Sequence, residues 1–180
     1  MRITREHSLG LIVDIQERLL PHIHRNETLE RNTILLIRGL QILKVPLAVS
    51  EQYPKGLGST IEPVKKLLEK EEFIEKTAFS CCDEPRFAEK LNLLSKRFVI
   101  IAGIEAHVCV LQTALDLLAN GYQPVVVTNC VGSRKEEDRD TALRRMVQEK
   151  VLLTTSESIL LELARISGTD AFRAISQLVK

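Results

Sequence analysis

Short apolar runs alternate with stretches of helical hydrophobic spacing along the whole chain. Unbroken apolar runs are typical of strands buried on both faces, whereas apolar residues three or four positions apart mark one face of a helix. Such runs predict strands at residues 8–15, 47–50, 98–102, 125–127 and 151–153, and the apolar pair within EFIEK predicts a weaker strand at 72–76. The helical spacing predicts helices at 26–44, 61–68, 83–94, 107–119 and 136–149, with two more near the C-terminus.

Capping signals indicate where three of these helices begin, because a side-chain oxygen at a helix start accepts from free backbone N–H groups. The caps are Ser59 or Thr60 for 61–68, a capping box of Thr154 and Glu157 for the next-to-last helix, and Thr169 or Asp170 for the last, which ends near Val179.

The regular alternation of strands and helices indicates an α/β protein. We expect a three-layer α/β/α sandwich with a Rossmann-like, mostly parallel sheet of about six strands. The chain contains no internal repeat, low-complexity tract or linker, so we expect residues 1–180 to form one domain. Functional sites in such folds gather at the carboxyl ends of the strands.

The segment from Arg97 to Val127 carries the first candidate residue. A buried strand is followed by Gly103, which predicts a tight turn, and then by a helix that places Cys109 in its first turn. Free N–H groups at a helix start favour the thiolate, which predicts a lowered pKa for this thiol and a role as nucleophile. A cysteine beside a core strand is also compatible with simple packing.

Two charged residues fall at other strand ends. Asp14 closes the first strand and is a candidate general base, and Lys76 closes the third and is a candidate for stabilising charge and polarising a substrate. Backbone N–H groups of Cys109 and of the turn at 104–106 are candidate oxyanion donors. Asp14 is equally compatible with capping the next turn, and Lys76 with an exposed surface position.

Composition narrows the functional class. The 25 basic and 24 acidic residues give a formal net charge of +1, and Trp is absent, which argues against a nucleic-acid partner. No apolar run approaches a membrane span, and the N-terminus lacks the apolar core of a signal peptide. The four cysteines lack the paired spacing of a zinc site, so we expect no metal or cofactor. They also indicate a chain with reduced thiols, so we expect a cytoplasmic location.

Three segments, LIVDIQ, KTAFS and GIEAHVCVLQTALDLLANGY, resemble in order and spacing the motifs of the isochorismatase-like cysteine hydrolases. This family includes nicotinamidases and N-carbamoylsarcosine amidase, and the resemblance covers nearly the whole chain. It implies the isochorismatase-like hydrolase fold and a triad of Asp14 as base, Lys76 and the nucleophile Cys109. It also implies a cis peptide at Ile104–Glu105, with the N–H groups of Glu105 and Cys109 forming the oxyanion hole.

The sequence departs from relatives at two places. The D-x-H metal-binding segment of nicotinamidases is replaced by EQYPKGLGST at residues 51–60, which has neither His nor Asp, so nicotinamide is a weak substrate candidate. Asn129 stands where related sequences often have Asp. Isochorismatases that act on a vinyl ether lack the nucleophilic cysteine, so the presence of Cys109 favours acyl chemistry.

The resulting hypothesis is an amidase-like hydrolase of a small molecule that works through an acyl-thioester on Cys109. A non-enzymatic partner-binding protein and a thiol redox protein are the alternatives; the latter requires Cys130 or the Cys81–Cys82 pair as resolving thiol. The apolar C-terminal segment, residues 159–180, is a candidate subunit contact in a homo-oligomer, although packing on its own sheet explains it equally well. The candidate substrate-binding residues are Gln16, Tyr53, Phe79 and Asn129.

Overall fold

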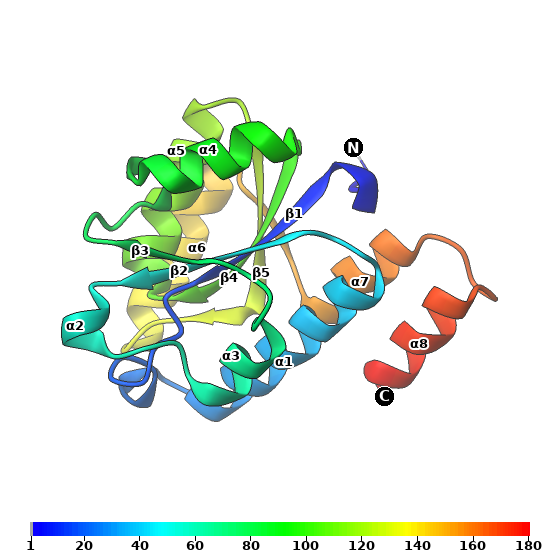
Figure 1. Cartoon of the computed structure of the whole chain (residues 1–180), viewed down its shortest axis with the longest axis horizontal. Helices are drawn as coiled ribbons and strands as arrows, with labels where there is room; N and C mark the ends of the chain where they lie inside the picture. The colour runs from blue at the N-terminus through cyan, green and yellow to red at the C-terminus, as the bar shows by residue number, and fades with distance from the viewer. Residues whose placement is uncertain (1) are drawn as a thin grey trace.

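A computed structural model describes residues 2–180 and contains one six-stranded sheet with all strands parallel (Figure 1). The strand order is β3-β2-β1-β4-β5-β6, so β1 and β4 lie side by side at the centre. The prediction of an α/β fold with a parallel sheet is therefore confirmed. The strands are β1 (Ser8–Val13), β2 (Leu47–Gln52), β3 (Phe73–Lys76), β4 (Phe98–Ile104), β5 (Gln123–Gly132) and β6 (Leu152–Thr154).

Helices cover both faces of the sheet and give it two separate apolar cores. Side chains alternate between the faces along a strand, so Ile12 joins one core while Leu11 and Val13 join the other. The first core is covered by α1 (Asn26–Ile42), α3 (Glu62–Leu67), α7 (Ser156–Ala164) and α8 (Asp170–Leu178). The second is covered by α4 (Pro85–Leu94), α5 (Leu111–Ala119) and α6 (Glu136–Gln148).

The C-terminal segment packs on its own chain. Ile159, Leu160 and Leu163 of α7 are buried in the first core, and α8 packs on α1 and α7 with Ile175 buried (Figure 1). Packing within the subunit therefore accounts for most of the apolar character of this segment.

Among residues 2–180, no helix is long and apolar enough to cross a membrane.

Two predicted helix starts are wrong because the capping side chains have other partners or positions. Helix α7 begins one residue later than the predicted capping box, and Thr155, not Thr154, accepts from the N–H of Ser158. Helix α3 starts after Ile61 without a side-chain cap, since Thr60 donates both its N–H and its hydroxyl to Glu51. The predicted cap at Thr169 is confirmed by its bond from the N–H of Phe172. A short helix, α2 (Pro54–Leu57), lies within residues 51–60, between the predicted second strand and the predicted helix at 61–68.

Strand β5 continues through residues 128–132, beyond the predicted end of this strand at residue 127. Between its two paired regions, β5 has three more residues than β4 and therefore bulges. Carbonyls of the bulge are satisfied by side chains: Asn32 donates to Asn129 O at 2.9 Å and Arg139 donates to Thr128 O at 2.7 Å. These long-range bonds provide donors for backbone carbonyls of the bulge, where the pairing of β5 with β4 is interrupted.

Strand β4 also runs further than predicted. Gly103 stays in the strand with φ of +139°, and a Cβ at this position would lie 2.1 Å from the carbonyl oxygen of Val13. The glycine is therefore required for the close approach of β1 and β4 and does not form the predicted turn. The chain turns at Ile104–Glu105 instead, and Ala106–Val110 forms a π-helical turn that leads into α5.

Candidate active site

The three residues Asp14, Lys76 and Cys109 meet at the carboxyl edge of the sheet. Asp14 follows β1, Lys76 is the last residue of β3, and Cys109 lies in the π-helical turn after β4. Strand β2 separates β1 from β3, so the lysine side chain must extend across the end of β2 to reach Asp14. The Lys76 Nζ lies 2.7 Å from Asp14 Oδ2.

Lys76 is buried, with 3% of its surface exposed, so the alternative of a surface lysine is wrong. Its ammonium donates to Asp14 Oδ2 and Gln52 Oε1, both at 2.7 Å, and to the carbonyls of Phe79 at 3.0 Å and Ala78 at 3.3 Å. Three N–H donors thus serve four acceptors. Burial lowers the pKa of Lys76, but the charge and hydrogen bond of the Asp14 carboxylate act in the opposite sense, and the net shift of this pKa is upward.

Asp14 is fully buried, and both of its oxygens are engaged. The Ser50 hydroxyl donates to Oδ1 at 2.7 Å, and Lys76 occupies Oδ2. Asp14 has a left-handed backbone conformation with φ of +53°, which turns the chain sharply at the end of β1. Because its carboxylate binds Ser50 and Lys76, Asp14 does not act as the cap of the following turn.

Cys109 is 4% exposed and belongs to the second core. Burial raises the pKa of its thiol, and the charge and hydrogen bond of the Asp14 carboxylate raise it further, while Lys76 partly offsets them. The prediction of a lowered pKa is therefore wrong, because burial and Asp14 outweigh the helix start. The thiol is neutral at rest, and a nucleophilic role requires transfer of its proton to a base.

The turn before Cys109 contains the predicted non-proline cis peptide, which is confirmed at Ile104–Glu105. The carbonyl of Glu105 accepts from the N–H groups of Val108 and Val110 at 3.1 and 3.2 Å. The N–H of Glu105 belongs to this cis peptide, at the end of β4 and just before the turn that carries Cys109. Its position makes it a candidate oxyanion donor.

Side chains attach this turn to the loop after β5. The Glu105 carboxylate is largely buried and accepts from Arg134 through its N–H at 3.3 Å and its Nε at 3.0 Å. His107 Nδ1 lies 2.9 Å from Ser133 Oγ, so this histidine is engaged away from the thiol. The two contacts fix the turn from the side of the segment Ser133–Arg134.

The other predicted site residues lie in three different surroundings. Gln16 is fully buried, donates to the carbonyls of Gln52 and Gly58 at 3.0 and 2.7 Å, and accepts from the N–H of Gln52. Phe79 and Tyr53 are about half exposed, at 52% and 54%. The Phe79 carbonyl binds Lys76, and Tyr53 lines a cavity of about 300 Å³ together with Lys76 and Thr77.

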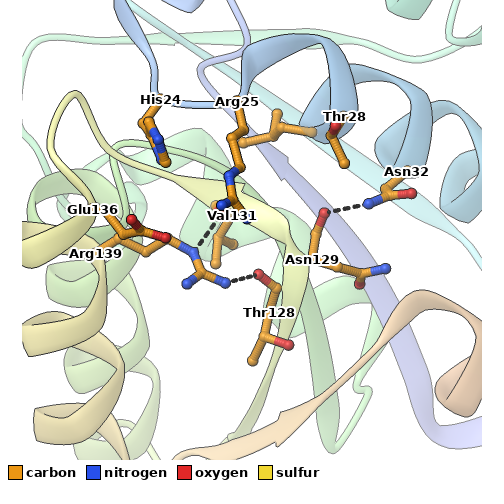
Figure 2. Close-up of a pocket in the computed structure, with 10 residues that line it drawn as sticks. His24, Arg25, Thr28, Asn32, Thr128, Asn129, Val131, Glu136 and Arg139 are labelled. Atoms are coloured by element: carbon orange, nitrogen blue, oxygen red, sulfur yellow. Dashed lines mark hydrogen bonds between the residues drawn. The ribbon is translucent and has the colours of Figure 1, made fainter.

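Asn129 lies apart from the triad, in a cavity of about 170 Å³ between the starts of α1 and α6 (Figure 2). Its amide accepts from the N–H of Ser156 and donates to the Ser156 hydroxyl, both at 2.9 Å. In Figure 2, Arg139 donates across this cavity to the carbonyls of Thr128 and Val131. These contacts hold the β5 bulge in place.

All four cysteines are free thiols. Cys130 lies in the first core, on the opposite face of the sheet from Cys109, so it cannot serve as a resolving thiol without a large rearrangement. Cys81 lies on the same face as Cys109, but burial raises its pKa to about 11, and burial also raises those of Cys82 and Cys130 to about 12. Such thiols react slowly near neutral pH, which disfavours the redox alternative.

Two residues that the sequence analysis missed complete the polar cluster. Ser50 and Gln52 lie at the carboxyl end of β2, between the strands of Asp14 and Lys76, and contact these two residues. Their position at the end of an apolar run was the available signal. Within residues 2–180, no group of three or more His, Cys, Asp or Glu side chains is arranged to hold a metal ion.

Comparison with known proteins supports the resemblance. Residues 8–158 match the isochorismatase domain family. Isochorismatase family protein 1B of Dictyostelium discoideum is 38% identical over 99% of this chain and 89% of its own length. Isochorismatase domain-containing protein 1 of Danio rerio is also 38% identical over 96% of this chain, which spans only 61% of that longer protein.

Solved structures show the same fold. The MAR1 ribonuclease of Caenorhabditis elegans is 38% identical, covers 99% of this chain and 92% of its own, and superposes with a TM-score of 0.94. The YcaC gene product of Escherichia coli, described as an octameric hydrolase of unknown specificity, is 23% identical with a TM-score of 0.93. The latter covers 99% of this chain and 90% of its own, and at this identity it shows the fold alone.

Proposed function

Because the chain belongs to the isochorismatase family, a family of hydrolases, we propose that it cleaves an amide or related C–N bond of a small molecule through an acyl-thioester on Cys109. The observation that carries the proposal is the buried Lys76–Asp14 ion pair beside the Cys109 thiol. Buried charges are costly unless they are paired, so their occurrence next to a nucleophile favours a chemical role.

In the first half of the reaction, Asp14 takes the proton of the Cys109 thiol as the sulfur attacks the substrate carbonyl carbon. The oxyanion that forms accepts from the N–H groups of Glu105 and Cys109. The tetrahedral intermediate then collapses, the C–N bond breaks, and the leaving amine takes the proton from Asp14. The neutral resting thiol makes this proton transfer necessary.

In the second half, Asp14 accepts a proton from water as the water oxygen attacks the thioester carbonyl. The C–S bond breaks, the carboxylic acid is released, and the proton on Asp14 returns to the Cys109 sulfur. Lys76 holds the Asp14 carboxylate in position throughout, since its own donors are already occupied by Asp14, Gln52 and carbonyl oxygens.

Trapping the intermediate tests the proposal. We expect the wild-type protein, incubated with a panel of small amides and quenched in acid, to carry the acyl mass on the peptide containing Cys109. Hydroxylamine should remove this mass, because it cleaves thioesters. An acyl group on any other residue, or turnover of an amide with no adduct on Cys109 under single-turnover conditions, would contradict the mechanism.

The attachment of the Glu105 turn gives a second prediction. Glu105→Ala removes the acceptor for Arg134 but keeps the backbone N–H, so the turn loses part of its support. We expect kcat to fall about tenfold, less than the 10²–10³-fold cost of losing an oxyanion donor, with KM changed less than about twofold. Steady-state kinetics measure both. Glu62→Ala, which removes an exposed ion pair with Lys66, is the control and should leave kcat unchanged.

The remaining features of the site follow from this reaction. We propose that Tyr53 and Phe79 contact the substrate at the mouth of the site. Gln16 contributes to substrate binding from its buried position beside Gln52, and Asn129 contributes from the cavity between α1 and α6. The reaction needs no metal or cofactor. We further propose that residues 1–180 form one domain in a cytoplasmic homo-oligomer, and the free thiols support a reducing location.

RNA hydrolysis is the second candidate, because the C. elegans protein of 38% identity is described as a ribonuclease. The formal net charge of +1 disfavours it, since proteins that bind polyanions usually present an excess of basic groups. Cleavage of a labelled single-stranded RNA by the wild type, but not by the Cys109→Ala variant, would favour this candidate over amide hydrolysis.

A further inference from the structure

The side chain of Gln52 connects the Lys76 ammonium to the backbone carbonyl of the next residue, Thr77. We propose that Gln52 is a positioning residue that holds the Lys76 ammonium against Asp14 as its neutral partner. This inference rests on the proposed hydrolase function, because it assigns a role within the same site.

The amide of Gln52 can bind in only one orientation. Its Oε1 accepts from Lys76 Nζ at 2.7 Å, and its Nε2 donates to the Thr77 carbonyl at 2.8 Å. A carbonyl needs a donor and an ammonium needs an acceptor, so the two ends of the amide cannot exchange. Gln52 therefore presents its oxygen, and not its amide nitrogen, to Lys76 in this arrangement.

The backbone of Gln52 is fixed as firmly as its side chain. Gln16 Oε1 accepts from the Gln52 N–H at 2.8 Å, and Gln16 Nε2 donates to the Gln52 carbonyl at 3.0 Å. Gln16 lies two residues after Asp14, so the segment that carries the base also anchors the residue that holds the lysine. Asp14, Gln16, Gln52 and Lys76 thus form one closed ring of contacts.

Charge explains why an amide suits this position. Asp14 is the only carboxylate that hydrogen-bonds the Lys76 ammonium, and the other acceptors within the described residues are neutral oxygens. A second carboxylate at position 52 would compete with Asp14 for the ammonium and add negative charge near the Cys109 thiol. It would also lack the donor that Thr77 O requires.

Two variants separate positioning from packing. Gln52→Met keeps the length and approximate volume of the side chain but removes both hydrogen bonds, and Gln52→Glu keeps the shape but adds charge. We expect Gln52→Met to lower kcat about 10–100-fold with KM within about threefold, since small misplacements of reacting groups have effects of this size. The matched control is Gln41→Glu, an exposed glutamine that likewise donates to a backbone carbonyl, that of Leu67. It should match the wild type.

An activity-independent measurement keeps this inference separate from the proposed function. The rate of alkylation of Cys109 by iodoacetamide is followed by mass spectrometry of its peptide as a function of pH. We expect Gln52→Glu to slow alkylation at pH 8 at least about threefold, because added negative charge disfavours the thiolate. Circular dichroism confirms that each variant is folded.

The outcomes are distinct. The positioning role is overturned by two results together. These are alkylation of Cys109 in Gln52→Glu at the wild-type rate, and a kcat of Gln52→Met within twofold of the wild-type value. If the wild type hydrolyses no amide, the proposed function fails. The alkylation rate of Cys109 in Gln52→Glu then decides by itself whether Gln52 acts on the group formed by Asp14, Lys76 and Cys109.

Discussion

Replacing Cys109 with alanine is expected to abolish hydrolysis, with a fall in kcat of at least about 10⁴-fold. Loss of the nucleophile of a catalytic unit typically has an effect of this size or larger, because no other group can form the covalent intermediate. The side chain is 4% exposed, and alanine leaves only a small void, so the fold should persist. Steady-state turnover of the best amide substrate and a thermal melt measure the two effects.

Cys130→Ala is the matched control for this variant. Cys130 is also a buried free thiol, but it lies in the core on the opposite face of the sheet. It should keep kcat within about twofold of the wild type while losing comparable stability. If Cys109→Ala keeps full activity on a substrate that the wild type hydrolyses, the thioester mechanism is wrong.

The second large effect is expected for Asp14→Asn, which should lower kcat about 10⁴-fold and at the same time lower the pKa of the Cys109 thiol. Turnover falls because the asparagine amide cannot take the proton of the thiol or of water. The thiol pKa falls because the carboxylate that raises it is gone while the Lys76 ammonium, which lowers it, remains. Activity and thiol ionisation therefore change in opposite senses.

The pH dependence of Cys109 alkylation, read on its own peptide, tests this combination. In the wild type, the rate should rise only at pH values well above those of an ordinary thiol, and in Asp14→Asn the rise should begin at lower pH. The variant leaves a buried ammonium without its carboxylate and should lose about 3–5 kcal/mol of unfolding free energy, so the assay is run well below its melting temperature. An unchanged or raised thiol pKa would show that Asp14 does not act on Cys109.

Much of the fold could be predicted from the sequence because the strands are buried on both faces. Runs such as Phe98–Ile104 have no polar face, and helical spacing between them leaves a parallel sheet as the simple solution. The candidate triad was accessible for a related reason. Asp14 follows an apolar run and Lys76 ends a short strand, and the parallel arrangement brings such strand ends to the same edge.

The features that escaped prediction depend on contacts between residues far apart in the chain. Residues 128–132 contain no unbroken apolar run, so the sequence does not predict that β5 continues there. The bonds from Asn32 and Arg139 to its carbonyls come from distant parts of the chain. The pKa of the Cys109 thiol depends on burial and on a carboxylate 95 positions earlier in the chain. The position of Cys109 near a helix start gives no information on either. The partners of Gln52 likewise come from two other strand ends, so sequence spacing alone gave it no role.

The bulge in β5 also bears on how the protein behaves at high concentration. Within residues 2–180, β5 pairs with β6 only as far as Val127, and unpaired strand edges can recruit a strand from another chain. Here the carbonyls of Thr128 and Val131 are already bound by Arg139, and that of Asn129 by Asn32. The irregular backbone and its occupied acceptors protect this edge against strand addition and aggregation.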